Sequence, residues 1–463
     1  MRPKKIIAIG LSMGMMLNLM SVSAVECVVI DEQNEDIGGI SVQSETEIEN
    51  EDLGTSAQSE IIVEDENFTQ SRETTDSENL DEISVELESV IENEKLEEVS
   101  AQSETVIASG KCGENITFKL TGDGVLTLSG SGAMPALEYD WKSYQPICGW
   151  GDYISSIKRI IIEDGITSIS QYSFYDCENL TEVSIPSSIK AIGYEAFHWC
   201  HNITKVMIDG LDSWCDIDFD EENANPLQFG ADLYINGVKQ TQIKIPEGIT
   251  EIKPYVFSRN WNNNESKASI TSILLPDTVT TIGENAFAYN YLQSINIPDS
   301  VLTIGTEAFA GNDFSTIEIS ENVNVIDDGV FRDCRRLQNI KIPNAARKLG
   351  EGLFVNCIKL ANVELPEKIE TIPATMFAGC TSLTQFKVPD TVQSIASSAF
   401  AKCSNLVNIE LSNQIHTIGD YAFSECSGLR EINLPMELEC IGDSAFMGCK
   451  ALEEVDIPGK VTS

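Results

Sequence analysis

The sequence of 463 residues predicts a repeat solenoid of β-rich coils, and three features indicate it. A phenylalanine recurs every 23 residues over the last third of the chain, and a cysteine follows it three residues later. Between each cysteine and the next phenylalanine lies one apolar pattern, LxxVxLPxxIxxI. The anchors are Phe331, Phe354, Phe377, Phe400, Phe423 and Phe446, with Cys334, Cys357, Cys380, Cys403, Cys426 and Cys449.

The length of the repeat selects one class of solenoid. A period of 23 lies in the leucine-rich-repeat range of about 20 to 29 residues and is too short for paired helices. Val363 and Leu365 alternate with polar residues, which predicts a strand with one face inward. Pro366 lacks an amide hydrogen and ends that strand. We therefore predict leucine-rich-repeat coils with a parallel sheet and a short helical turn carrying Phe377, each coil covered by the next.

Residues 1–24 have the features of a signal peptide. Three basic residues precede an uncharged run, and Val22 and Ala24 suit the small-residue rule for cleavage. An uncleaved membrane anchor is the alternative, but polar residues inside the run weaken it as a span of about 20 residues. We expect an extracellular protein, secreted or held at the cell surface, with no membrane-spanning region in the mature chain.

Residues 25–108 have the composition of a disordered acidic linker. From 26 to 108 there are 26 Asp and Glu against Arg72 and Lys95, which gives a net charge of −24 (2 minus 26). Such a segment buries too little apolar surface to offset the entropy of an ordered chain, and its charges repel one another. A solvated spacer is expected here.

Residues 109–153 predict a small N-terminal β cap. Apolar alternation on both sides of Gly122-Asp123-Gly124 predicts a hairpin. The first coil needs a cap because its apolar end would otherwise face water. The aromatic residues expected to cover that end are Tyr139, Trp141, Tyr144 and Trp150.

The cap and the first coil resemble a known family. The stretch SGKCGENITFKLTGDGVLTLSGSGAM, and then IKRIIIEDGITSI with SFYDC, are similar to the N-terminal module and first repeat of BspA-like leucine-rich-repeat surface proteins. The resemblance covers residues 109–463. It implies extracellular, non-enzymatic repeats that are linked to adhesion to host proteins or other cells. The chain departs from the family module around Cys148, where a proline followed directly by tryptophan is expected.

The solenoid is expected over residues 154–463, with eleven complete coils and a twelfth that starts at Leu452. The period breaks twice. The 60 residues between Phe197 and Phe257 leave an irregular insertion at 210–240, and seven extra residues precede Phe287. Loops that leave a rigid scaffold often carry binding residues. The candidate partner-binding residues are Trp214, Phe219, Tyr234 and Trp261, with packing over the adjacent coils as the alternative.

The cysteines are expected to be free thiols for the most part. Asn260, Asn290 and Asn312 replace cysteine at the same place in three coils, which indicates a buried turn position that accepts either residue. A ladder of disulfides or metal ligands is not predicted for that reason. Cys112 with Cys148 is the most plausible disulfide in the chain.

No cofactor or metal site is expected. Asp216, Asp218 and Asp220 imitate a calcium loop, but Glu221 replaces its required glycine and Leu227 its final glutamate. Beyond the predicted signal peptide, the sequence has no GxSxG, HExxH or GxxxxGK[ST] motif, which disfavours an enzyme.

The charge balance bears on the partner. Residues 109–463 carry a net charge of −22 (25 minus 47), which disfavours nucleic acid. We expect a secreted or cell-surface, non-enzymatic binding module for an extracellular protein or glycan. The alternative is a structural scaffold of a larger surface protein, with an enzyme or wall-binding domain beyond residue 463.

Overall fold

The computed structural model describes residues 105–140, 145–259 and 270–462, together with the backbone of four strands nearer the N-terminus. The chain divides into two compact units, Met1–Glu92 and Asn93–Ser463. In the first unit, four strands form one antiparallel sheet in the order β3-β2-β1-β4. Their bounds are β1 (Lys5–Gly10), β2 (Val25–Ile30), β3 (Ile40–Glu45) and β4 (Ile62–Val63).

The predicted signal peptide and acidic linker fall mostly in this first unit. Three of its strands lie in the range where a linker without strands is expected. One of them, β2, contains Val28, Val29 and Ile30, which are β-branched residues of high strand propensity. The rest of both segments lies outside the described residues, so their boundaries and roles remain predictions.

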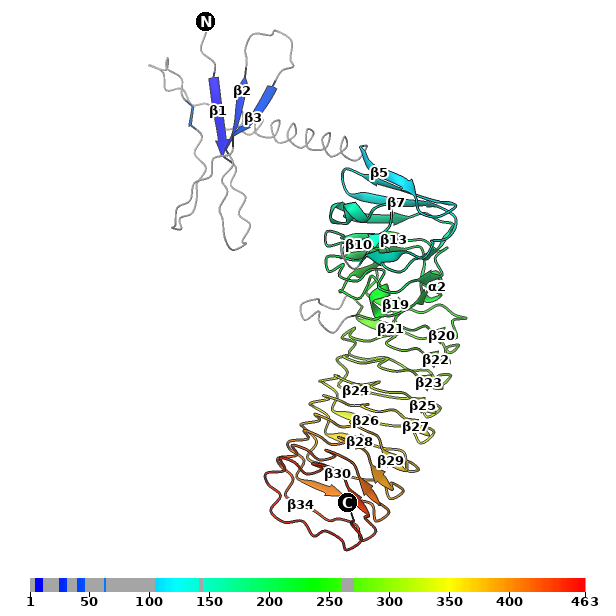
Figure 1. Cartoon of the computed structure of the whole chain (residues 1–463), viewed down its shortest axis with the longest axis vertical. Helices are drawn as coiled ribbons and strands as arrows, with labels where there is room; N and C mark the ends of the chain where they lie inside the picture. Colours follow the sequence, from blue (N-terminus) through cyan, green and yellow to red (C-terminus); the bar gives the residue numbers. More distant parts are fainter. Residues whose placement is uncertain are drawn as a thin grey trace, which may run out of the picture. The chain divides into compact units, whose positions relative to one another are not determined.

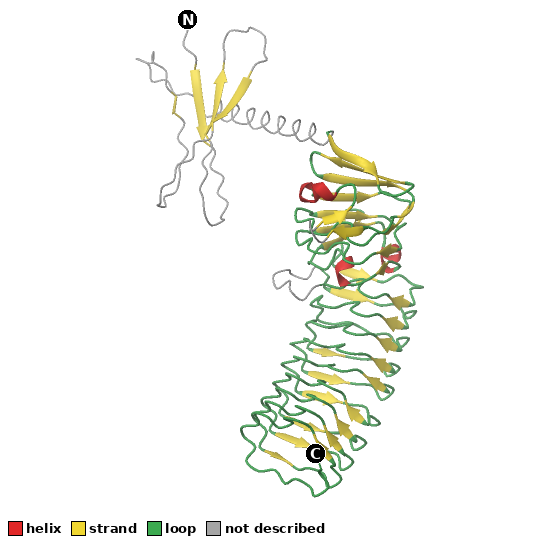
Figure 2. Cartoon of the chain, in the orientation of Figure 1, coloured by secondary structure: helices red, strands yellow, loops and turns green. Residues whose placement is uncertain are grey.

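The second unit is a β-solenoid of about 12 turns, which confirms the predicted fold class. Successive turns follow one another along the stack in sequence order (Figure 1). Most turns contribute two short strands, so the solenoid carries two faces of parallel strands where we expected one parallel sheet (Figure 2).

The first face is made by the strands that contain the VxL segment of each coil. Its strands are β11 (Arg159–Ile162), β13 (Glu182–Ile185), β15 (Lys205–Ile208), β17 (Asp232–Ile235), β19 (Gln242–Lys244), β21 (Ser272–Leu274), β24 (Thr316–Ile317), β26 (Asn339–Lys341), β28 (Asn362–Glu364), β30 (Gln385–Lys387), β32 (Asn408–Glu410) and β34 (Glu431–Ile432).

The second face is made by the xxIxxI segment. Its strands are β8 (Gly132–Ala133), β12 (Ile166–Ile169), β14 (Ala191–Ile192), β16 (Asp218–Phe219), β20 (Glu251–Ile252), β22 (Thr281–Ile282), β23 (Thr303–Ile304), β25 (Val325–Ile326), β27 (Lys348–Leu349), β29 (Thr371–Ile372), β31 (Ser394–Ile395), β33 (Thr417–Ile418) and β35 (Cys440–Ile441).

The N-terminal cap is an antiparallel extension of the first face. Strands β5 (Val106–Lys111), β6 (Ile116–Thr121) and β7 (Val125–Gly130) pair in that order, and β7 then pairs with β11 in parallel. The hairpin predicted at Gly122-Asp123-Gly124 is confirmed. Gly124 has a φ of +88°, and a Cβ there would lie 2.5 Å from the Ser156 carbonyl oxygen. A short antiparallel pair, β9 (Glu138–Asp140) and β10 (Gln145–Ile147), follows these strands within the predicted cap.

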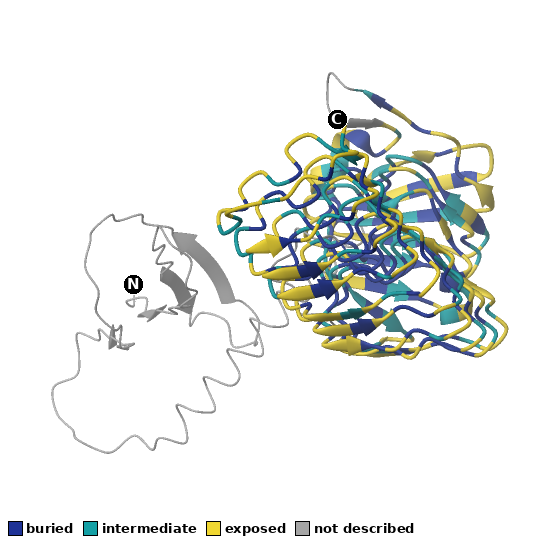
Figure 3. Cartoon of the chain, turned by 90° about the horizontal axis from the view of Figure 1, so that it is seen from below, coloured by how far each residue is buried: buried dark blue, intermediate teal, exposed yellow. Residues whose placement is uncertain are grey.

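The core of the solenoid is a column of aromatic rings. Seen along the stack, buried residues line the inside of the coils and exposed residues the outside (Figure 3). The rings of Phe400 and Phe423 stack 5.4 Å apart, and those of Phe423 and Phe446 stack 5.5 Å apart. At the other end, Trp150 stacks on Phe174 at 6.0 Å, and its Nε1 donates to the Ser173 carbonyl oxygen at 2.8 Å. The cap role predicted for Trp150 is confirmed, whereas Trp141 and Tyr144 lie outside the described residues.

The turns that carry the phenylalanines are not helical, so that part of the prediction is wrong. In nearly every coil, the residues two before and two after the phenylalanine have positive φ, for example Thr375 at 53° and Gly379 at 80°. A right-handed helix cannot contain two left-handed residues four apart. The described helices are short and lie in the first half of the unit (Figure 2): η1 (Gly151–Ser156), α2 (Leu211–Cys215) and η2 (Glu222–Ala224).

A ladder of side-chain donors links successive coils. Seven of the described cysteine thiols donate to the carbonyl oxygen of the phenylalanine one coil earlier, as Cys380 does to Phe354 at 3.2 Å. Asn290 and Asn312 make the same bond through Nδ2, to Phe257 and Phe287. The prediction of a shared buried turn position is therefore confirmed, although the thiol is a donor as well as a packing group.

The twelve cysteines of the second unit are free thiols. The disulfide proposed between Cys112 and Cys148 is therefore not formed. Burial raises the pKa of the Cys112 thiol and raises that of Cys148 to about 12. Both thiols are thus neutral and poorly nucleophilic at ordinary pH.

Candidate binding surface

The residues predicted to bind a partner do not form one surface. Trp214 and Phe219 are only 1% and 6% exposed, and their rings meet edge to face at 5.4 Å in the core. Tyr234 lies half-buried on β17, with the Lys205 ammonium 5.9 Å from its ring. Trp261 lies outside the described residues. Only Tyr234 can therefore be placed at the surface.

Trp214 has a structural role that its sequence context hides. The coil that contains η2 has Ala224 where other coils have the core phenylalanine: the Phe197 amide donates to the carbonyl oxygen of Asn223, the residue just before Ala224, at 3.1 Å. Trp214 Nε1 donates to the Val256 carbonyl oxygen at 3.0 Å, just before Phe257. Trp150 makes the equivalent bond just before Phe174. An indole thus begins each of two columns of phenylalanine rings.

The acidic run at 216–222 is held by the protein itself. Lys253 Nζ lies 2.7 Å from Asp218 Oδ1, and Lys190 Nζ lies 3.1 Å from Asp216 Oδ2. Asp220 accepts a hydrogen bond from the Tyr194 amide at 3.1 Å. Within the described ranges, His, Cys, Asp and Glu form no group of three that could hold a metal ion. The three aspartates that resemble a calcium loop in the sequence therefore make ion pairs and hydrogen bonds between coils.

Aromatic side chains gather on the turn edge of the first two coils, where sequence analysis placed no site. We call Tyr139, Tyr172, Tyr175, Tyr194, His198 and Trp199 the aromatic patch. Its rings are linked by contacts of 4.7 Å (Tyr139 to Tyr175) to 6.2 Å (Tyr172 to Tyr175). Tyr194 is 44% exposed and Trp199 is 47% exposed, while Tyr139 and Tyr175 are buried beneath them. Rings that are supported from below in this way are rigid and ready to contact a ligand.

The turn geometry explains why these rings face outward. Tyr172 and Trp199 occupy the two left-handed positions that flank the core phenylalanine, with φ of 58° and 62°. A reversed backbone at these positions leaves the phenylalanine inside and turns its neighbours toward the edge. The edge rings then meet between coils: Tyr172 and Tyr194 contact edge to face at 5.8 Å, and Tyr175 and His198 stack at 5.3 Å.

The patch is surrounded by carboxylates. The turn segments 170–179, 193–202 and 220–229 contain no lysine or arginine. They contain six carboxylates, which we call the acidic rim: Asp176, Glu178, Glu195, Asp220, Glu221 and Glu222. In the described parts of the chain, these groups form no ion pair with lysine or arginine, and Glu195 alone pairs, with His198 at 3.7 Å. The rim therefore keeps its negative charge.

The ionisation of neighbouring groups reflects this charge. A hydrogen bond to Glu195 and the charge of that carboxylate raise the pKa of Tyr194 to about 12. Burial, and then the nearby Glu178, raise the pKa of Asp176. Burial also raises the pKa of Glu222, with added repulsion from Glu221. Burial is the main cause for the two carboxylates, and the neighbouring negative charges add to it.

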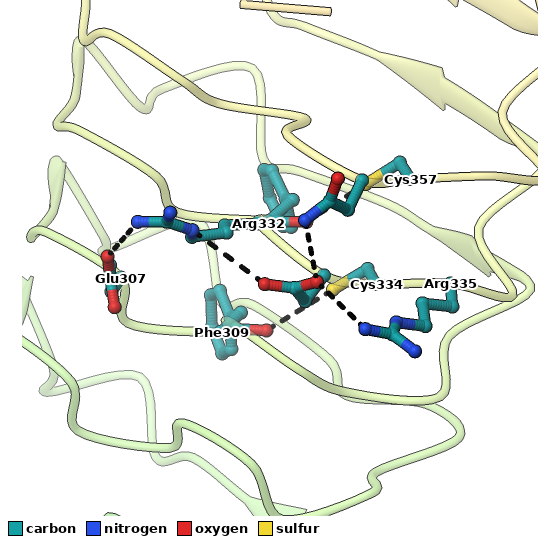
Figure 4. A network of polar contacts seen from close by, with 9 residues as sticks. Glu307, Phe309, Arg332, Cys334, Arg335 and Cys357 are labelled. Carbon is teal, nitrogen blue, oxygen red and sulfur yellow. Dashed lines mark hydrogen bonds and ion pairs between the residues drawn. The ribbon is translucent and has the colours of Figure 1, made fainter. Parts of the chain in front are cut away.

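Further along the same edge, the protein neutralises its own carboxylates. Arg332 lies 3.0 Å from Glu307 and 3.7 Å from Asp333, and Arg335 lies 3.5 Å from Asp333. Figure 4 shows this network beside the thiol of Cys334, which donates to the Phe309 carbonyl oxygen at 3.3 Å. These coils pair their turn carboxylates with arginine, whereas the coils of the patch do not.

A family model decides the relationship of the chain to known proteins. The model described as BspA type leucine rich repeat region (6 copies) matches residues 152–262, 262–384 and 347–463, which together exceed half of the chain. The chain belongs to the BspA-type leucine-rich-repeat family. The resemblance stated from the cap and first coil is therefore confirmed.

A solved structure shares the fold of this BspA-type protein, and others are similar to parts of it. A leucine-rich repeat protein from Eubacterium ventriosum matches with 24% identity and a TM-score of 0.56, over 75% of this chain and 96% of that one. A leucine rich cell surface protein from Faecalibacterium prausnitzii matches with 23% identity and a TM-score of 0.40, over 74% and 93%. None of the curated proteins matches the chain. In the described ranges, no helix is both long and apolar enough to cross a membrane.

Sequence analysis of the BspA-type coils missed the aromatic patch because the patch residues lie in coils of regular length. A search for broken periods finds residues 210–240 and passes over Tyr194 and Trp199. The useful signal is different: aromatic residues at the outward turn positions of adjacent coils, in segments without lysine or arginine.

Proposed function

We propose that the protein is a secreted or cell-surface BspA-type leucine-rich-repeat protein that acts as a non-enzymatic binding module, with adhesion to an extracellular protein or glycan as its role. The aromatic patch is the observation that carries this proposal. Exposed aromatic rings on a rigid scaffold are the kind of residue that dominates binding energy in interfaces. The family match and the predicted signal peptide support a location outside the cell.

Binding of the full-length protein to a panel of extracellular matrix proteins and neutral glycans tests the proposal. We expect at least one ligand to bind, and Tyr194→Ala and Trp199→Ala to weaken that binding. The matched control is Tyr421→Ala, because Tyr421 is also 44% exposed and stands at a left-handed turn position, far from the patch in the sequence. Absence of binding by the parent, or equal binding by both patch variants and the parent, would contradict the proposal.

A further inference from the structure

The aromatic patch and the acidic rim together restrict the chemistry of the ligand. The two most exposed rings, Tyr194 and Trp199, present faces with the negative potential of a π-system. The carboxylate of Glu195 follows Tyr194 directly, and Asp176 belongs to the coil beneath. A cation placed over such a ring is attracted by the ring and by the carboxylates at the same time.

The rim disfavours other classes of ligand. A sulfated glycan, a nucleic acid or an anionic membrane would be repelled by six carboxylates with no lysine or arginine among them. A neutral sugar could stack on the rings, but it would leave the charge of the rim uncompensated. A cationic ligand supplies the charge that Arg332 and Arg335 supply farther along the edge.

We propose that the aromatic patch and the acidic rim bind a lysine- or arginine-rich segment of a partner polypeptide. Basic side chains lie over the exposed rings, and their charges face the rim. The net charge of −22 over residues 109–463 (25 minus 47) favours encounter with a basic segment at low ionic strength. This inference rests on the proposed binding function and specifies its ligand.

Fluorescent deca-lysine and deca-arginine peptides are the probes for the test, with deca-glutamate and a neutral hexasaccharide, chitohexaose, for comparison. We expect the basic peptides alone to bind the full-length protein, with an affinity that falls as salt is added. Trp199→Ala should weaken binding about three- to thirty-fold, which is the range of one cation–ring contact. Trp199→Tyr should restore most of the affinity because it keeps a ring.

Charge is tested separately from the ring. The double variant Asp176→Asn with Glu221→Gln should weaken binding and reduce its salt dependence. Glu410→Gln and Tyr421→Ala, both outside the patch, should bind as the parent does. Circular dichroism and thermal unfolding of every variant show whether the fold is retained.

Two outcomes would overturn the inference, and they differ in whether the patch remains a binding site. If chitohexaose binds, the basic peptides do not, and Trp199→Ala abolishes the sugar binding, then the ligand class is wrong and the patch remains a binding site. If basic peptides bind equally well to the parent, to Trp199→Ala and to the charge variant, then attraction to the whole acidic protein explains the binding and the patch is not the site.

Discussion

Cysteine and asparagine are interchangeable at the ladder position because both present a donor to the phenylalanine carbonyl one coil earlier. They are not identical. Phe287, Phe309 and Phe331 follow one another at 22 residues, and the cysteine coils that follow repeat at 23. In the shorter turn, Asn312 Oδ1 also accepts the amide of Leu292 at 2.9 Å. The amide side chain thus satisfies the backbone group that the missing residue leaves without a partner.

The thiol hydrogen bond predicts a difference between two small substitutions at Cys380. Ser keeps an O–H donor for the Phe354 carbonyl oxygen, whereas Ala removes it. We expect Cys380→Ala to be less stable than Cys380→Ser by about 1 kcal/mol in the free energy of unfolding. Urea unfolding with reductant present measures it. An alanine variant as stable as the serine variant would show that the thiol only fills space.

Buried thiols also predict sensitivity to alkali. Burial raises the pKa of Cys334 to about 12 and that of Cys449 to about 11, from an ordinary value near 9. In the unfolded chain these thiols lose protons above about pH 9, while in the fold they stay protonated. Their contribution to stability is therefore complete below pH 9 and is lost as pH rises toward 11 to 12.

The urea concentration at the midpoint of unfolding should therefore decrease as the pH is raised from 9 to 10.5 in the presence of reductant. Serine does not ionise in this range, so a variant with serine at Cys334, Cys357 and Cys380 should lose less stability over the same interval than the parent. Parallel declines in parent and variant would assign the effect to other groups.

At the scale of one coil, the turn is shaped by two left-handed residues around each phenylalanine. Some coils use glycine, which adopts positive φ without cost, as at Gly352 with φ of 63°. Others use a β-branched residue, as at Thr375, where the same conformation is strained.

Exchanging these residue types predicts changes of opposite sign. Thr375→Gly should raise the free energy of unfolding by about 1 kcal/mol because it relieves the strain. Gly352→Thr should lower it by about 1 to 3 kcal/mol, since its Cβ would lie 3.2 Å from Val355 Cγ2 and 3.3 Å from Thr375 Oγ1. Guanidinium unfolding measures both. Destabilisation by the glycine variant would mean that the turn conformation is different.

The pairing of strands on the first face predicts a charge effect. Lys341 of β26 is in register with Glu364 of β28, and Lys387 of β30 is in register with Glu410 of β32. Lys341 makes its close ion pair with Glu321 at 2.5 Å, so Lys341 and Glu364 interact through proximity and not through direct contact. Glu364→Lys should destabilise by up to about 1 kcal/mol at low salt.

That loss should shrink as salt is added. Glu364→Gln is the control, because it removes the charge without adding repulsion. Equal stability of the lysine and glutamine variants at low salt would contradict the register.

At the scale of the whole solenoid, the sequence predicts the features that recur in every coil. The column from Phe331 to Phe446 and its cysteines were predictable because the same residue types pack at the same positions in every coil. The second face of strands was only implied by the xxIxxI spacing. The turns were predicted as helical because spacing alone does not reveal positive φ at residues such as Thr375 or Ser398.

Features that occur once were harder to predict. Trp214 replaces a missing core ring at Ala224, and no period in the sequence relates those two positions. Trp214 was therefore a candidate for partner binding, with packing over the adjacent coils as the alternative, and the structure shows that it packs in the core. The aromatic patch was missed for the opposite reason, since Tyr194 and Trp199 sit in coils of normal length and look like ordinary turn substitutions.

Successive coils are joined by free thiols that donate hydrogen bonds, and not by disulfides. Alkylation of the full-length protein without reductant, followed by peptide mass spectrometry, tests it directly. We expect six cysteines to be unmodified in the folded protein and fully alkylated once it is unfolded in denaturant: Cys334, Cys357, Cys380, Cys403, Cys426 and Cys449. Disulfide-linked peptides between any of these six cysteines would contradict it.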